Sequence, residues 1–188
     1  MKNVIGKITW CMMILGMFSC DFGGHVDSTK GAIIRQPAQS FTKGKHKVGL
    51  YAYEAFKPFL EAKNDTTYIV NFWATWCKPC VEELPYFEAL YEQYKDQKVR
   101  LILVSLDFEE QIQTKLLPFM IKQDLKGEVL VLSQDGMNNW IDKIDPSWSG
   151  ALPATLIYNK DKRAFFEQSF DDKTLEQQLQ SFQIKLNQ

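Results

Sequence analysis

Two cysteines separated by two residues, Cys77 and Cys80, carry the clearest chemical potential in this sequence. They lie in the segment NFWATWCKPC, residues 71–80. A pair at this spacing suits half of a zinc site, a structural disulfide, or a disulfide that is formed and broken during a reaction. The residues around the pair decide among these three.

Metal binding fits the rest of the chain poorly. A tetrahedral zinc site takes four ligands, but no cysteine or histidine follows Cys80, and His25 and His46 both precede the motif. Copper(I) accepts two thiolates, although copper carriers of related fold usually add a downstream histidine. We therefore expect no metal and no organic cofactor, and a copper(I)-binding carrier stays only as an alternative.

A purely structural disulfide makes weak use of this spacing, because the stabilisation grows with the length of the closed loop. Cys77 follows a β-branched and aromatic run at the point where a helix is expected to begin. Unpaired N–H groups and the helix dipole lower the pKa of a thiol there. Lys78 adds a positive charge, and Pro79 suits a first helical turn. We predict a redox pair in which Cys77 attacks and Cys80 resolves.

The elements that must position this pair alternate between strands and helices. Hydrophobic patterns predict strands at 66–73, 99–106, 128–132 and 153–158, with a hairpin partner at 163–170. Helices are predicted within 49–65, 77–95, 109–123 and 175–186, with a short one around Trp140. This order predicts an α/β fold with a largely parallel sheet that the closing hairpin makes mixed.

The first twenty residues differ from the rest. Lys2 and Lys7 flank the start of a short apolar stretch, residues 8–18, that is too short to span a bilayer and is typical of a secretory signal. The segment MFSC at its end resembles a bacterial lipobox, in which Cys20 would carry lipid; the alternative is a leftover thiol in a plain signal peptide. We expect a lipoprotein signal peptide at 1–19, a lipid-anchored tether at 20–47 and a folded domain at 48–188.

Composition and charge support an ordinary globular domain. The chain has 188 residues, of which 45% are hydrophobic and 24% charged, enough apolar side chains to form a core. Its net charge of −1 creates no field that would favour nucleic acid. If Cys11 leaves with the signal peptide and Cys20 carries lipid, Cys77 and Cys80 remain as the thiols of an exported protein.

The string VNFWATWCKPCVEELP, together with this order of elements, resembles the TlpA/ResA group of membrane-anchored thiol–disulfide oxidoreductases. The resemblance covers about residues 48–188. It implies a thioredoxin-like three-layer α/β/α sandwich with a C-terminal hairpin and helix. It also implies that Cys77 is the nucleophile, that Cys80 resolves, and that Pro153 is a cis-proline opposite them. Trp76, Leu152 and Pro153 would then contact the substrate.

Three polar positions near the motif complete the expected site. Asn71 stands where many thioredoxins have an aspartate that takes the proton of the second cysteine, and Asn71 cannot ionise. Glu83 matches a glutamate of the TlpA/ResA group and could accept the Cys80 proton or select substrates; the alternative is a carboxylate that only favours the helix dipole. Asp107, at a predicted strand end, could line the rim, although an exposed turn aspartate is commoner.

The resemblance implies an exported protein-disulfide reductase, anchored by lipid on the periplasmic side of a bacterial membrane. Its substrates would be exported thiol or disulfide proteins, including those of cytochrome c maturation, and its electrons would come from a membrane thiol donor. Nucleic acid is not an expected partner. A disulfide oxidase or isomerase, or a non-catalytic thiol or copper(I) carrier, is the alternative.

Overall fold

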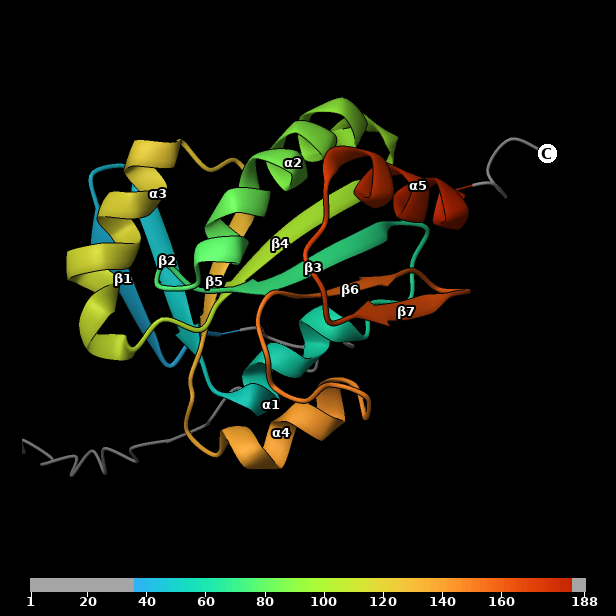
Figure 1. Cartoon of the computed structure of the whole chain (residues 1–188). Coiled ribbons are helices and arrows are strands. Elements are labelled where there is room, and N and C mark those ends of the chain that lie inside the picture. The colour runs from blue at the N-terminus through green and yellow to red at the C-terminus, as the bar shows by residue number, and fades with distance from the viewer. Residues whose placement is uncertain (1–35, 184–188) are drawn as a thin grey trace, which may run out of the picture. The chain divides into compact units, whose positions relative to one another are not determined.

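Two strands made almost wholly of buried side chains form the centre of the sheet, as their β-branched and aromatic residues predict. They are β3, Thr67–Trp73, and β4, Val99–Ser105, which pair in parallel. The computed structural model describes residues 36–183. In this part of the chain seven strands form one sheet in the order β1-β2-β5-β4-β3-β6-β7 (Figure 1).

The outer strands make the sheet mixed. β5, Glu128–Leu132, pairs in parallel with β4, and β2, His46–Tyr51, in parallel with β5. β6, Ala154–Tyr158, runs antiparallel to β3, and β7, Arg163–Phe166, closes the predicted hairpin with β6. The predicted mixed, mostly parallel sheet is therefore confirmed.

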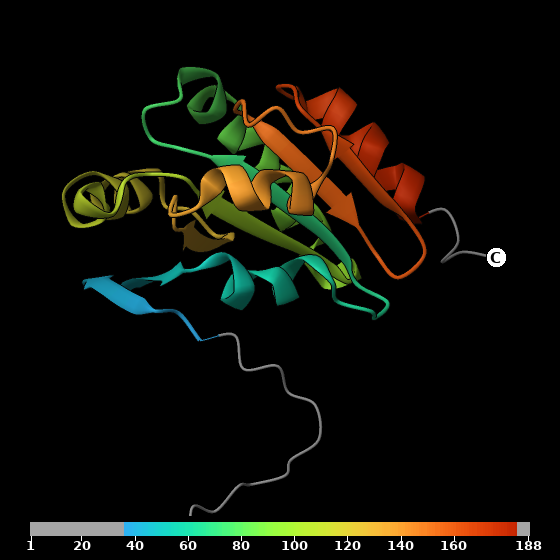
Figure 2. The ribbon, with the colours of Figure 1, turned by 90° about the horizontal axis from the view of Figure 1, so that it is seen from below.

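Helices cover both faces of the sheet (Figures 1 and 2). One face packs against α2, Lys78–Tyr94, α3, Leu117–Gln123, and α5, Asp172–Gln183. The opposite face packs against α1, Tyr53–Phe56, the 3-10 turn η1, Lys57–Leu60, and α4, Met137–Ile144. Each face has its own buried apolar cluster, which confirms the predicted three-layer sandwich.

The structure corrects the predicted boundary between tether and domain. Residues 39–47 were predicted to belong to the tether, but β1, Gln39–Lys43, pairs with β2 in an antiparallel hairpin at the edge of the sheet. Phe41 and Val48 bury their side chains in the core. Gly44 turns the hairpin with a φ of 60°, a conformation that glycine adopts easily. The Lys-Gly-Lys sequence is thus a turn.

Two predicted helices are also less regular than expected. Within residues 49–65, β2 continues to Tyr51 and only the short α1 and η1 follow. The predicted helix at 109–123 begins with a 3-10 turn, η3, Glu109–Gln111, and a π-helical segment, η4, Ile112–Leu116, before α3. Pro118 lacks the N–H that a regular α-helix needs at its position, so the wider π turn lies just before it. One further 3-10 turn, η2, Lys95–Gln97, ends α2.

The predicted signal peptide and the lipidation at Cys20 lie outside the described residues. Among the helices of residues 36–183, none combines the length and the apolar character that crossing a bilayer requires.

Candidate active site

Cys77 and Cys80 form a disulfide at the junction of β3 and α2, with their Cα atoms 5.3 Å apart. Cys77 is the N-cap residue of α2, and its Sγ accepts the backbone N–H of Cys80 at 3.3 Å. The helix begins directly after Cys77, as predicted, and Pro79 lies in its first turn. Cys77 is 7% exposed and Cys80 is fully buried, so Cys77 is the more accessible sulfur.

A buried carboxylate holds the loop that leads to Cys77. Asp107, just beyond β4, accepts the backbone N–H of Thr75 at 3.1 Å and 3.2 Å, and the Thr75 hydroxyl also donates to it. The Ser105 hydroxyl donates to the same carboxylate at 2.8 Å. Asp107 is only 2% exposed, so the interpretation of this residue as an exposed turn aspartate is wrong. Its position at a strand end was the signal available in the sequence.

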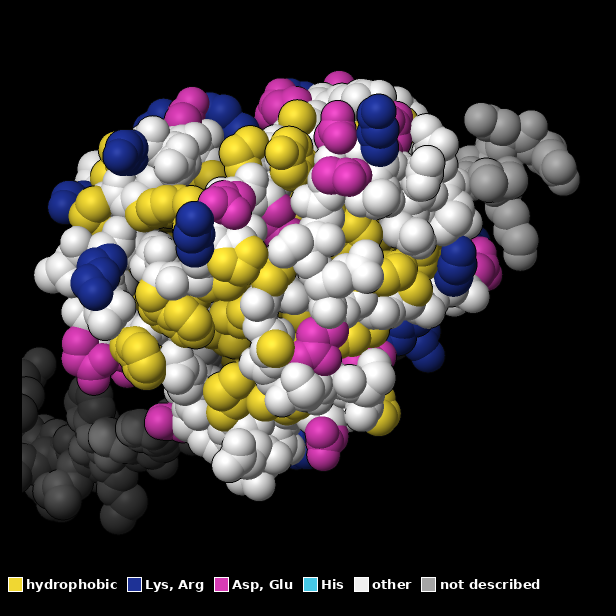
Figure 3. Space-filling view, viewed as in Figure 1, with side chains coloured by type: hydrophobic (Ala, Val, Ile, Leu, Met, Phe, Trp, Pro, Cys, Tyr) yellow, Lys and Arg dark blue, Asp and Glu magenta, His cyan; other side chains and the backbone are white. Residues whose placement is uncertain are grey.

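An apolar cavity opens beside Cys77. It encloses about 530 Å³ and is lined on its apolar side mainly by Trp76, Leu106, Phe108, Met137 and Leu152. Trp76 and Phe108 remain about half exposed, at 54% and 49%. Figure 3 shows hydrophobic side chains gathered between α3 and α4, below the start of α2. The structure thus brings the predicted substrate contacts Trp76 and Leu152 together next to the disulfide.

The loop before β6 carries the predicted cis-proline. The peptide bond between Leu152 and Pro153 is cis. Trp148 donates its Nε1–H to the carbonyl oxygen of Ala151 at 2.9 Å. The carboxylate of Glu167 accepts the backbone N–H groups of Ser149 and Ala151 at 3.0 Å and 3.1 Å. Sequence reasoning missed Glu167, because it lies in a different segment beyond β7.

Behind Cys80, Glu83 lies one helical turn further along α2 and is 2% exposed. Its Oε1 accepts the Nδ2–H of Asn71 at 2.9 Å, and its Oε2 accepts the backbone N–H of Phe170 at 2.8 Å. Burial raises the pKa of Glu83 to about 7, against the opposing effect of these two hydrogen bonds. A carboxyl group that titrates near neutral pH suits proton transfer.

The side chain of Lys78 lies at the surface of the protein. Its side chain is 86% exposed and pairs with Glu82 at 3.6 Å. Water screens an exposed charge of this kind. The expected effect of Lys78 on the thiolate therefore stays a prediction.

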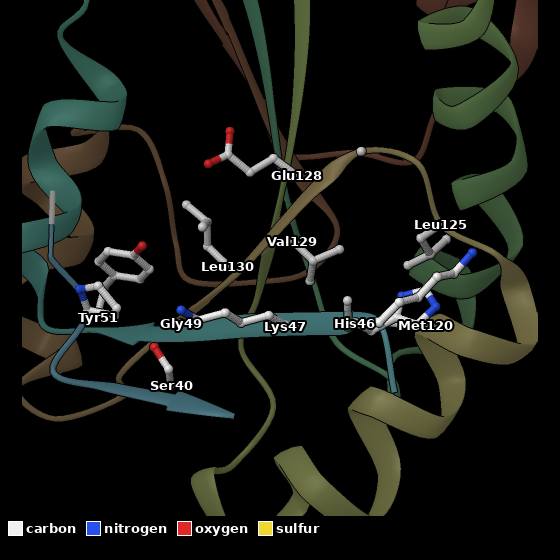
Figure 4. Close-up of a pocket in the computed structure, with 13 residues that line it drawn as sticks. Ser40, His46, Lys47, Gly49, Tyr51, Met120, Leu125, Glu128, Val129 and Leu130 are labelled. Carbon is white, nitrogen blue, oxygen red and sulfur yellow. The ribbon is translucent and has the colours of Figure 1, made fainter. Parts of the chain in front are cut away.

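A second cavity, of about 420 Å³, lies where β2 and β5 separate (Figure 4). Its lining includes Ser40, His46, Lys47 and Glu128 but no cysteine. The described residues contain no cluster of three or more histidine, cysteine or acidic side chains able to hold a metal ion. The disulfide and its surroundings are therefore the best candidate for chemistry.

Comparison with known proteins places the chain among thioredoxin-like proteins. Residues 34–163 match the model of the AhpC/TSA family. A thiol-disulfide oxidoreductase ResA of Bacillus cereus is 37% identical over 109 residues, which cover 57% of each chain. The ResA of Oceanobacillus iheyensis is 41% identical over 73 residues, which cover 36% of this chain and 38% of that relative. The chain thus matches less than two thirds of the length of these curated relatives.

Solved structures confirm the predicted thioredoxin-like fold. A thiol:disulfide interchange protein of the thioredoxin family from Chlorobium tepidum TLS superposes with a TM-score of 0.54 at 17% identity, covering 78% of this chain and 94% of the other. A DsbF homologue from Corynebacterium diphtheriae gives the same TM-score and identity over 67% of this chain and 75% of the other. At such low identity these likenesses show the fold alone.

Proposed function

We propose that this chain, which belongs to the AhpC/TSA family, is a thiol–disulfide oxidoreductase that acts on other proteins through Cys77 and Cys80. The observation that carries this proposal is the asymmetric disulfide at the start of α2, with one sulfur beside a surface cavity and the other buried behind it. Relatives named thiol-disulfide oxidoreductase ResA support the same activity.

The reaction follows from this geometry. In the reduced protein, the thiolate of Cys77 attacks one sulfur of a substrate disulfide, and the other substrate sulfur leaves as a thiolate. The Cys80 thiol gives its proton to Glu83 and attacks Sγ of Cys77, which releases the second substrate sulfur. Two electrons have then passed to the substrate, and the internal disulfide has formed. A thiol donor must supply two electrons before the next turnover.

We expect the substrate to bind in the apolar cavity beside Cys77. Trp76 and Leu152 line the same cavity as Cys77, so a segment that presents a cystine to Cys77 would lie against apolar side chains. Pro153 follows Leu152 through the cis bond, and we expect it to contact the same segment. Glu167 and Trp148 hold the cis-proline loop in position from behind. Such fixed surroundings favour attack at one sulfur because the reacting atoms are aligned before the reaction.

The proposal extends to the direction of electron transfer and to the location of the protein. We take the protein to be a reductase, exported and held by lipid on Cys20 at the periplasmic side of a bacterial membrane. Its electron donor would be a membrane thiol protein, and its substrates exported disulfide proteins, including those of cytochrome c maturation. The resemblance to the TlpA/ResA group and the signal-like residues 1–20 support this extension.

Three experiments test the proposal. The Cys80→Ser variant should accumulate a mixed disulfide between Cys77 and a model disulfide protein, whereas Cys77→Ser should accumulate none; equal trapping in both would refute the assigned roles.

The reduction potential of the Cys77–Cys80 pair decides whether the protein reduces or oxidises its substrates. A value near or below about −270 mV supports a reductase, and a value near about −120 mV would indicate an oxidase. Release of the Cys20→Ala variant from membranes would support the lipid anchor.

A further inference from the structure

The side chain of Asn71 is buried and only half satisfied. Its Nδ2 donates to Oε1 of Glu83 at 2.9 Å and to the hydroxyl of Thr155 at 3.2 Å. Its Oδ1 has no hydrogen-bond partner among the described residues, although Asn71 is fully buried. A buried carbonyl oxygen without a donor is costly, so its presence calls for a reason.

Protonation of Glu83 creates a conflict in this arrangement. Both carboxylate oxygens of Glu83 already face N–H groups, Oε2 that of Phe170 and Oε1 that of Asn71. A proton on either oxygen would occupy a lone pair that these N–H groups leave free, but neither of the two groups bonded to Glu83 could accept a hydrogen bond from the new O–H. The backbone N–H of Phe170 is fixed by the chain. The amide of Asn71, by contrast, exchanges the places of its oxygen and nitrogen by rotating about one bond.

We propose that Asn71 turns its side-chain amide when Glu83 takes up a proton, so that Oδ1 replaces Nδ2 as the partner of Glu83. The O–H of Glu83 then donates to Oδ1. The Thr155 hydroxyl accepts from Nδ2 before the turn and donates to Oδ1 after it, because a hydroxyl can do either. Glu83 thus has a matching partner on Asn71 in each protonation state, and Oδ1, which has no donor before the turn, has two after it. Nδ2 then takes the place in which Oδ1 had no partner, so the turn is favoured only while Glu83 carries its proton.

This inference rests on the proposed function and deepens it. When the Cys80 thiol becomes a thiolate, its proton moves to Glu83, three residues later on the same face of α2. The turn of Asn71 stabilises that protonated state, and the reverse turn favours the return of the proton. Asn71 is thus a positioning residue for Glu83. An aspartate at this position could not donate when ionised, and it would repel ionised Glu83.

The groups that surround Glu83 leave this role to Asn71. β3 contributes Asn71, β6 contributes Thr155, and the segment before α5 contributes the backbone of Phe170. On α2 itself, the reduced Cys80 thiol is the titratable group one turn away. Among the described residues, no charged side chain acts on the pKa of Glu83. When Glu83 gains or loses a proton, a neutral partner must therefore adjust its hydrogen bonds to the new state.

Neutron diffraction on the oxidised protein tests the turn directly, because deuterated nitrogen and oxygen scatter differently. Crystals are compared at about pH 9 and about pH 5, on either side of the Glu83 titration. We expect Nδ2 of Asn71 to face Glu83 at the higher pH and Oδ1 to face it at the lower pH. The same amide orientation at both pH values, with Glu83 protonated only at the lower, would overturn the proposal.

A solution measurement gives an independent test. The carboxyl ¹³C signal of Glu83 is titrated in the oxidised wild type and in Asn71→Leu. If Asn71 forms a hydrogen bond with both ionised and protonated Glu83, the variant loses a hydrogen bond in each form. The titration midpoint of Glu83 should then rise by less than about one pH unit. A larger rise would show that Asn71 supports only the ionised form and would overturn the turn. Neither readout uses substrate, so failure of the proposed exchange activity would be seen separately, in the trapping experiment.

Discussion

Two carboxylates near the disulfide, Asp107 and Glu83, are each 2% exposed, yet their surroundings differ. Asp107 accepts hydrogen bonds from the backbone and hydroxyl of Thr75 and from the Ser105 hydroxyl. Glu83 accepts only two N–H groups, and burial raises its pKa to about 7.

The difference shows that burial alone does not assign a role to a carboxylate. The partners of Asp107 belong to the loop before Cys77 and to the end of β4, so its negative charge fixes the shape of that loop. The partners of Glu83 belong to β3 and to the segment before α5, and one of them is an amide that can rotate. We therefore propose that Asp107 holds the geometry of the loop and that Glu83 takes up and releases a proton.

The largest expected effect tests whether Asp107 holds the loop before Cys77. Asp107→Ala leaves the Thr75 N–H and the Ser105 hydroxyl without their acceptor, and we expect the free energy of unfolding to fall by about 2–4 kcal/mol. Asp107→Asn keeps the shape and one acceptor oxygen, so it should lose less. Urea unfolding of the oxidised protein measures both. Equal stability of Asp107→Ala and wild type would show that the carboxylate does not hold the loop.

The next effect concerns the pH dependence of stability. Because the pKa of Glu83 is raised from 4.5 to about 7, the folded protein keeps a proton that the unfolded chain has released. This contribution is fully present below about pH 4.5 and is lost as the pH rises to about 7; its size is at most about 3 kcal/mol. Glu83→Gln should flatten the stability curve over that range. An unchanged slope in the variant would contradict the assignment.

A rate measurement tests whether Glu83 accepts the proton of Cys80. Glu83→Gln removes the acceptor for the Cys80 proton, and we expect the resolving step to slow by about a hundredfold near pH 7. Glu88→Gln is the matched control. Glu88 lies on the same helix, is partly buried and, like Glu83, accepts two N–H groups, in this case the backbone N–H groups of Lys126 and Gly127. Among the described hydrogen bonds, Glu88 has none to either cysteine. Rapid-mixing kinetics of mixed-disulfide resolution compare the two. Equal slowing in both variants would point to a structural cause.

The smallest effect is expected for an exposed charge. Lys78→Ala breaks an ion pair with Glu82 in which both side chains are largely in water. Such pairs contribute little, so the free energy of unfolding should change by less than about 0.5 kcal/mol. Thermal unfolding of the two proteins is a sufficient measurement. A loss as large as that of Asp107→Ala would mean that surface charge, too, shapes this site.

Much of the fold could be predicted because its strands are local apolar runs that are buried on both sides. The hairpin of β1 and β2 could not, since polar residues cover most of β1 and only Phe41 marks its buried side. The cysteine pair was visible from its spacing, whereas the cis bond before Pro153 came only from the family resemblance. The polar network was hidden for a different reason: Glu83 meets Phe170 across 87 positions, and Asn71 meets Thr155 across 84. Such contacts follow from the order of strands and leave no local pattern.

The exposure of Trp76 has an optical consequence. Its indole lines the same cavity as Cys77 and is half exposed to water. A nearby disulfide quenches indole fluorescence, so reduction of the pair should brighten the emission of this side chain. The protein therefore carries its own reporter of redox state, and the loss of the signal change in Trp76→Phe would separate this indole from that of the buried Trp73.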